Sequence, residues 1–230
     1  MALFLVGGCA GDGEEAEEQN RPPPAAVEEV LGEIERARPG VVLRSFVRAA
    51  RRRDERGMWQ RLSAPSRRLL GPGLAAFRRG PAAGLEQELS GLGRRNRLFL
   101  SETITASFAV AAVAHDSRVY AAALRLEDGL WRLELASAIR IKPLRPKPGE
   151  TVERRTQLAA EVTAGAPVVE AGLWLDGRAF PSRGGGPTPN ALTMFGETAR
   201  LPRGPHTVVA FASTTAGATA RAWAFRASVR

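Results

Sequence analysis

Cysteine, lysine and long apolar runs are scarce in this chain of 230 residues. The single cysteine, Cys9, excludes an internal disulfide, so this residue needs another explanation. No stretch reaches the roughly 20 consecutive apolar residues of a membrane-spanning helix. Lys142 and Lys147 are the only lysines, so 33 basic residues minus these two leaves 31 arginines.

What the chain has in quantity is arginine, alanine, glycine and proline. A hydrophobic content of 44% predicts a packed core, and 24 glycines with 16 prolines predict many turns. The net charge is +9 despite an acidic cluster near the N-terminus, made of Asp12, Glu14, Glu15, Glu17 and Glu18. Two interpretations stay open: the composition of a GC-rich genome, or a basic surface that attracts an anionic partner.

The first eleven residues read Met-Ala-Leu-Phe-Leu-Val-Gly-Gly-Cys-Ala-Gly. An apolar run from Ala2 to Val6 and two glycines precede Cys9, and this pattern resembles the lipobox of bacterial lipoproteins. In that family a lipid is attached to the cysteine thiol, and cleavage makes the cysteine the first residue. The resemblance implies a signal remnant at residues 1–9, lipidation of Cys9 and an extracytoplasmic protein anchored to the cell membrane.

The residues before Cys9 differ from a complete secretory signal, which has a basic n-region and about 7–15 apolar residues. No lysine or arginine precedes Cys9, and the apolar run is short. A start codon assigned too far downstream accounts for both departures, whereas the alternative is a cytosolic protein with an incidental cysteine. Residues 10–24 are polar and rich in proline, which predicts a disordered tether.

A first domain is predicted over residues 25–145, and it begins with apolar residues at helical spacing. Ser63 or Ser66 is predicted to cap a short helix over 67–70. The other predicted helices cover 25–38, a segment starting near Val41, 58–62 and 74–92, the last interrupted at Gly80-Pro81. The second of these helices carries arginines along one side, which make it a candidate contact for an anionic surface: Arg44, Arg48, Arg51 and Arg52.

Beyond Leu98 the apolar period changes from 3.6 to 2, which predicts strands. Asp128-Gly129 is a two-residue hairpin signal that places Leu126 opposite Trp131 and Leu124 opposite Leu133. Helices followed by an antiparallel meander predict an α+β cone. The strands of this meander are predicted near 98–105, 108–112, 120–126 and 130–135.

Two segments resemble nuclear transport factor 2-like domains: Val41–Ala50 with Met58–Ser63, and the strand Leu130–Leu135. That fold hosts enzymes and non-enzymes alike, and its enzymes place Asp, His or Tyr inside the cone. Because His115 and Asp116 fall in a predicted turn, we predict no catalytic residue. Six aromatic residues either line a ligand pocket in the cone or simply form its core: Trp59, Phe77, Phe99, Phe108, Tyr120 and Trp131.

The second half of the chain has the pattern of an all-β domain. Three prolines within Lys142–Gly149 predict a stiff linker, placed at residues 146–150, before a small β-sandwich over 151–230. Asp176-Gly177 is a second hairpin signal, and the glycines and prolines of 182–190 predict a mobile loop. Leu201–Ala210 and Arg221–Phe225 resemble the last strands of bacterial immunoglobulin-like domains.

The residues that carry chemistry are also scarce. There is no serine elbow, no phosphate-cradling glycine loop, no acidic cluster for calcium and no His/Cys set for zinc, so we expect neither cofactor nor metal. The leading hypothesis is an envelope lipoprotein with a non-catalytic structural or interaction role, whose partner is another envelope protein or a wall polymer. The alternatives are small-ligand binding in the cone, an enzyme on the same fold, and anionic-surface binding through the arginine helix. Export argues against nucleic acid as a partner.

Overall fold

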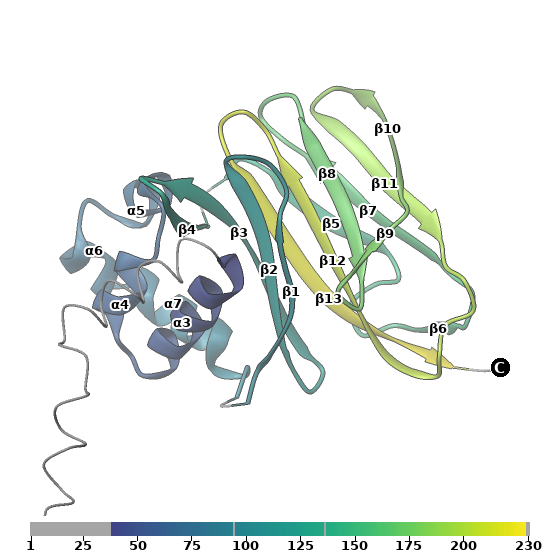
Figure 1. The fold of residues 1–230 in the computed structure, drawn as a ribbon, viewed down its shortest axis with the longest axis horizontal. Coiled ribbons are helices and arrows are strands. Elements are labelled where there is room, and N and C mark those ends of the chain that lie inside the picture. The colour runs from purple at the N-terminus through teal and green to yellow at the C-terminus, as the bar shows by residue number, and fades with distance from the viewer. Residues whose placement is uncertain (1–37, 94, 136, 229–230) are drawn as a thin grey trace, which may run out of the picture.

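The computed structural model describes residues 38–93, 95–135 and 137–228. The described chain is β-rich and forms four stacked layers, one of short helices and three of sheet (Figure 1). Three N-terminal predictions lie outside the described residues: the lipidated Cys9, the tether over 10–24 and almost all of the helix over 25–38.

Within the described residues five helices make up the first layer, and local signals explain where four of them begin. Pro39 and Pro81 occupy first-turn positions, where a missing N–H costs nothing. The Asp54 carboxylate accepts from Gly57 N at 2.8 Å, and Ser63 caps its helix as predicted, because its hydroxyl accepts from Ser66 N. The helices are α3 (Pro39–Arg51), α4 (Glu55–Gln60), α5 (Ala64–Leu70), α6 (Leu74–Arg78) and α7 (Pro81–Ser90).

Sheet A is an antiparallel meander that lies against these helices. Its hairpin turn has Asp128 and Gly129 at φ 51° and 75°, as a two-residue turn of this kind requires. Leu126 faces Trp131 and Leu124 faces Leu133, so the predicted register is confirmed. The strands, in spatial order, are β1 (Arg97–Thr103), β2 (Phe108–His115), β3 (Arg118–Glu127) and β4 (Leu130–Glu134).

Sheets B and C form a β-sandwich, and all their pairings are antiparallel except that β6 runs parallel to β13. Sheet B has the order β10 (Arg183–Thr188), β11 (Ala191–Glu197), β7 (Gln157–Thr163), β5 (Arg140–Arg145). Sheet C has the order β6 (Thr151–Glu153), β13 (Ala218–Ser228), β12 (Gly204–Ser213), β8 (Glu170–Leu175), β9 (Arg178–Phe180).

Three apolar cores hold the four layers together. The first lies between the helices and sheet A, and includes Phe46 and Phe77. The second lies between sheets C and B, around Leu158 and Trp223. The third lies between sheets A and C and includes Phe211. Sheet A is therefore covered on both faces, by helices on one and by the sandwich on the other (Figure 1).

This packing differs from the expected cone. Helices and meander follow one another in the predicted order, but large side chains fill the space between them, among them Phe46, Phe77, Met58 and Leu133, all fully buried. The second face of sheet A is also apolar, and it packs against sheet C. The structure therefore has a β-sandwich, as predicted, but does not show the predicted α+β cone.

The proline-rich segment Lys142–Gly149, predicted as a stiff linker, is partly strand. Residues 140–145 form β5, which pairs with β7, so the sandwich begins before the predicted boundary at 146. Gly149 N donates to Ala224 O, and Arg226 N donates to Glu150 O, so the residues after β5 are bonded to β13. The prolines misled the prediction because β5 is an edge strand, where proline is tolerated.

The predicted mobile loop at 182–190 is largely strand β10, paired with β11. It too is an edge strand, so Pro187 removes no interior ladder bond. Gly186 is needed for close approach, because a Cβ there would lie 1.9 Å from Ala191 O. The glycines therefore serve a strand pairing and not only a turn.

Candidate functional site

The six aromatic residues considered for a pocket do not come together. Trp59, Phe77 and Trp131 lie in the core between helices and sheet A, with the rings of Trp59 and Phe77 5.3 Å apart. Phe99 and Phe108 belong to the opposite face of sheet A, in the core against sheet C. Tyr120 alone of the six lines a surface cavity. The other five lie in or against the packed cores.

The cavity beside Tyr120 is a groove between the two halves of the molecule. It consists of two adjoining hollows with volumes of about 620 Å³ and 500 Å³, which share residues from three elements. Helix α7 contributes Glu88, strand β3 contributes Val119 and Tyr120, and strand β13 contributes Arg221 and Ala222. Cavities of this size, at the junction of two packed units, are where proteins commonly bind ligands. We call this feature the interlayer groove.

Both strands in the groove have unpaired stretches. Strand β4 pairs with β3 only from Ala123 onward, and β6 pairs with β13 only from Arg226 onward. In an antiparallel ladder, alternate residues direct N–H and C=O to opposite sides. Within the described chain, the edge of β3 before Ala123 and the edge of β13 between Thr219 and Arg221 are not hydrogen-bonded to another strand. Backbone groups on such edges are free to bind an extended segment.

The larger end of the groove is mostly apolar, and the charged residues in its lining are mainly basic. Arg118 and Arg226 are exposed there, and the Arg118 guanidinium lies so close to Gly91 that a Cβ would meet Nη1 at 1.8 Å. Arg221 is held in place by donating from Nη1 to Ile141 O at 2.9 Å. These cations face one carboxylate in the lining, Glu88. The balance favours an occupant that carries negative charge.

Two ionisable groups at the centre of the groove have shifted pKa values. Burial raises the pKa of Tyr120, and the negative charge of Glu88 raises it further. Partial burial also raises the pKa of Glu88. Tyr120 therefore stays a protonated hydroxyl at neutral pH and can donate a hydrogen bond.

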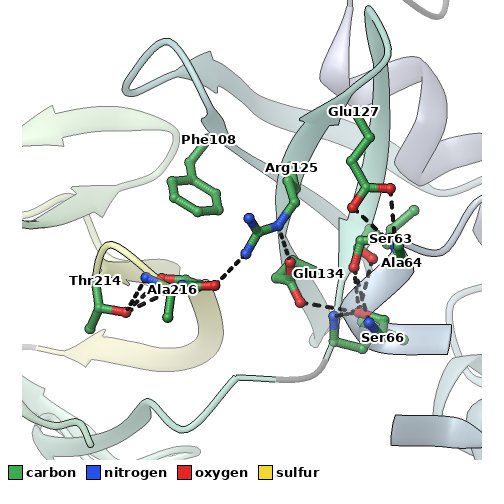
Figure 2. Close-up of polar contacts among 12 residues, drawn as sticks. Ser63, Ala64, Ser66, Phe108, Arg125, Glu127, Glu134, Thr214 and Ala216 are labelled. Atoms are coloured by element: carbon green, nitrogen blue, oxygen red, sulfur yellow. Dashed lines mark hydrogen bonds and ion pairs between the residues drawn. The ribbon is translucent and has the colours of Figure 1, made fainter. Parts of the chain in front are cut away.

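A buried polar cluster surrounds Glu134, which lines the smaller hollow of the groove (Figure 2). The Arg125 guanidinium donates from Nε to Glu134 Oε2 at 2.6 Å and from Nη2 to Ala216 O at 2.5 Å. Ser66 Oγ lies 3.2 Å from Glu134 Oε1 and 2.7 Å from Ser63 Oγ. We call these residues the Glu134 cluster. It joins α5, both strands of the hairpin and the β12–β13 turn, so it fastens the sandwich to sheet A.

Glu134 itself is only 2% exposed, and burial raises the pKa of its carboxyl. The Arg125 guanidinium and the Ser66 and Ser63 hydroxyls act in the opposite direction and do not cancel that effect. Sequence reasoning missed this cluster. A signal existed, because the hairpin register aligns Ala123 with Glu134, which puts Arg125 and Glu134 diagonally on one face.

Each of the two histidines lies beside an aspartate at a turn or a strand start. His115 and Asp116 lie at the predicted turn between β2 and β3, 3.5 Å apart and partly to fully exposed. His206 lies near the start of β12, with Nδ1 2.7 Å from Asp176 Oδ2 and Nε2 2.9 Å from Pro202 O. Among the described residues, no three His, Cys, Asp or Glu side chains are grouped as metal ligands. No helix in the described part is long and apolar enough to span a membrane.

The arginines of α3 lie on its exposed side. Arg44, Arg48 and Arg52 are exposed, and Arg51 is half-buried beside Glu86 and Gln87 of α7. The predicted alignment along one helix side is thus present for three of the four. These residues are remote from the interlayer groove, whose lining does not include them.

No protein-family model and no curated protein matches this sequence. Solved structures with a weak similarity include an endo-β-1,4-mannanase from Thermotoga petrophila, at 12% identity over 40% of this chain and 20% of that one, with a TM-score of 0.34. CopC from Methylosinus trichosporium OB3b matches at 14% identity over 40% of this chain and 96% of its own, with a TM-score of 0.30. Fibronectin(III)-like modules of Clostridium thermocellum CbhA match at 16% identity over 54% and 60%, with a TM-score of 0.30. The chain thus spans about a fifth of the mannanase, and these weak likenesses say nothing about its function.

Proposed function

We propose that this chain is a lipid-anchored envelope protein with a non-catalytic binding role, and that its interlayer groove receives an extended segment of another envelope component. The observation that carries the proposal is the groove itself, with two unpaired strand edges beside a protonated tyrosine and three arginines. Addition of a strand to an open sheet edge gives affinity through main-chain hydrogen bonds and specificity through side-chain pockets.

Two further features support binding in the groove over binding inside the helical unit. The space between the helices and sheet A holds a packed core, which includes the fully buried Phe46 and Phe77. The groove is also bounded by elements of both halves, and the Glu134 cluster fixes their relative position. A preformed cleft loses little entropy on binding, because its walls are already ordered.

The proposed assignment of the two halves to known kinds of domain rests on their sequence resemblances. The helices followed by a four-stranded meander are consistent with a nuclear transport factor 2-like unit, although its interior is closed. The strands β12 and β13, with His206 at the start of the first, are consistent with the closing strands of an immunoglobulin-like domain. Both kinds of unit host binding proteins as well as enzymes, so the groove and not the fold supports the proposed role.

Anchoring is tested by fractionation of cells that express the gene with its upstream start. Wild-type protein is expected in the membrane fraction, because a lipid on Cys9 partitions into the bilayer. Cys9→Ala is expected in the soluble extracytoplasmic fraction, and Ala10→Ser serves as the matched control that stays with the membrane. Equal solubility of wild type and Cys9→Ala would contradict the anchor.

Binding in the groove is tested by placing a photo-crosslinking amino acid at Ser117, on the rim of the larger hollow, in the native host. An adduct with an envelope component is expected on illumination. The same amino acid at Thr188, exposed on β10 at the far edge of sheet B, is the matched control and is expected to give none. Matching adducts at both positions, or none at Ser117, would contradict the groove as the binding site.

A further inference from the structure

The exposed arginines of α3 form a surface separate from the groove. Arg44, Arg48 and Arg52 follow one another at intervals of four residues, which places them about 6 Å apart along the helix axis and on one side of it. All three are exposed, while the opposite side of α3 is buried against β1, β2, β4 and α7. We call these three residues the arginine face.

The arginine face has no structural task within the described residues. Other arginines of the helical layer do: Arg61 Nη1 donates to Gly57 O at 2.8 Å, and Arg67 Nε donates to Trp59 O at 3.0 Å. Arg53 lies 4.0 Å from Glu86. In contrast, no hydrogen bond or ion pair joins the guanidinium group of Arg44, Arg48 or Arg52 to any described residue. Three adjacent like charges without a partner repel each other, so folding does not explain them.

The surrounding layer is also the most basic part of the structure. Residues 38–93 contain twelve arginines and four carboxylates, whereas 95–135 and 137–228 contain seventeen basic and eleven acidic residues. The excess therefore falls on the helical layer, which forms one end of the stack, with sheet B at the other (Figure 1). A composition set only by the genome would spread this excess evenly along the chain.

We propose that the arginine face docks on the anionic lipid headgroups of a membrane. Guanidinium groups bind phosphate through paired N–H donors, and basic residues beside a bilayer strengthen attachment that a lipid chain begins. Docking would turn the helical layer toward the membrane and the sandwich away from it, which fixes the orientation of the groove. The proposal goes beyond groove binding and depends neither on the groove nor on the lipid at Cys9.

The test uses the full chain with Cys9→Ser, which carries no lipid, and sedimentation with vesicles. Vesicles of equal parts phosphatidylglycerol and phosphatidylcholine are expected to bind it at about 0.1 M salt, and to release it at about 1 M salt, where charges are screened within about 3 Å. Pure phosphatidylcholine vesicles are expected not to bind. Each arginine near an anionic surface contributes a factor of about five, so Arg44→Gln, Arg48→Gln and Arg52→Gln together are expected to weaken binding about 100-fold.

The matched control removes the same charge from the sandwich. Arg178→Gln, Arg183→Gln and Arg200→Gln are all exposed positions of the sandwich and are expected to change binding less than about fivefold. Equal losses in the two triple variants would overturn the proposal, because net charge alone would then explain binding. Equal binding to phosphatidylcholine, or none to either vesicle, would also overturn it.

One competing occupant is the chain's own acidic cluster at residues 12–18. If the Cys9→Ser chain fails to bind vesicles but the same chain with Glu14, Glu15, Glu17 and Glu18 changed to Gln binds them, the face is held by that segment and the headgroup proposal falls. If the Cys9→Ser chain binds and the glutamine variant binds only a few-fold more tightly, the headgroup proposal is supported. Glutamine is a good helix former, so far-ultraviolet circular dichroism of every variant should match wild type.

Discussion

Arg125→Ala is expected to lower the free energy of unfolding by about 3–5 kcal/mol, because it leaves the Glu134 carboxylate buried without its cation. The arginine also donates to Ala216 O in the β12–β13 turn and lies over the Phe108 ring at 4.9 Å, so one substitution removes contacts on both sides of the A–C boundary. Urea unfolding followed by tryptophan fluorescence measures this loss. Arg178→Ala, an exposed arginine of β9, is the control and is expected to change stability by less than about 0.5 kcal/mol.

A double-mutant cycle separates the charge pair from its packing. Arg125→Met with Glu134→Gln retains the size of both side chains and leaves no charge buried. We expect the double variant to lose clearly less than the sum of the single losses, because Glu134 no longer needs a partner. Additive losses would mean that the two residues act independently, and the role assigned to the Glu134 cluster would then be wrong.

The shifted pKa of Glu134 makes the contribution of the same cluster to stability depend on pH. Burial raises this pKa in the folded protein above the ordinary value of 4.5, so the folded state holds its proton to higher pH than the unfolded chain. Its contribution to stability is therefore fully present below pH 4.5 and is lost as the pH rises through the folded value. Because the pKa of Glu88 is raised in the same direction, the comparison must be with Glu134→Gln, in which this part of the slope should disappear.

Local features could be predicted from the sequence because their causes are local. The Asp128-Gly129 turn dictates the register of β3 and β4, and the Ser63 cap follows from its position before Pro65 and Ser66. The order of the layers was missed, although a signal was present in β2. Its first six residues, Phe108–Val113, are all buried, and such a continuous apolar run is typical of a strand covered on both faces.

The interlayer groove could not be predicted from sequence in the same way. Its walls come from α7, β3 and β13, which lie more than 90 residues apart at the extremes, and its shape depends on how sheet A stacks on sheet C. Proline and glycine also concealed the strands β5 and β10, because sequence rules treat them as breakers and both occur here on sheet edges. With those strands taken for linker and loop, the two halves seemed independent.

Phe211→Ala tests whether the two halves are one cooperative unit. Phe211 is fully buried on β12, in the core between sheets A and C that also contains Val110 and Trp174. Many of its neighbours there are alanines, such as Ala112 and Ala123, whose short side chains cannot move into the space that the ring would leave. We expect the variant to lose about 3–5 kcal/mol of unfolding free energy, as for other large-to-small changes in a packed core.

Phe195→Ala is the matched control, because Phe195 is on β11 and is 39% exposed. Its loss should stay below about 1 kcal/mol, since little packed volume disappears. Urea unfolding of wild type should show one transition, with fluorescence and circular dichroism coinciding, because the A–C core is shared and Trp174 Nε1 also donates to Glu102 Oε2 of β1 at 2.7 Å. Two separate transitions in wild type, or a loss for Phe211→Ala no larger than for Phe195→Ala, would mean that the halves fold independently and that the groove between them is not preformed.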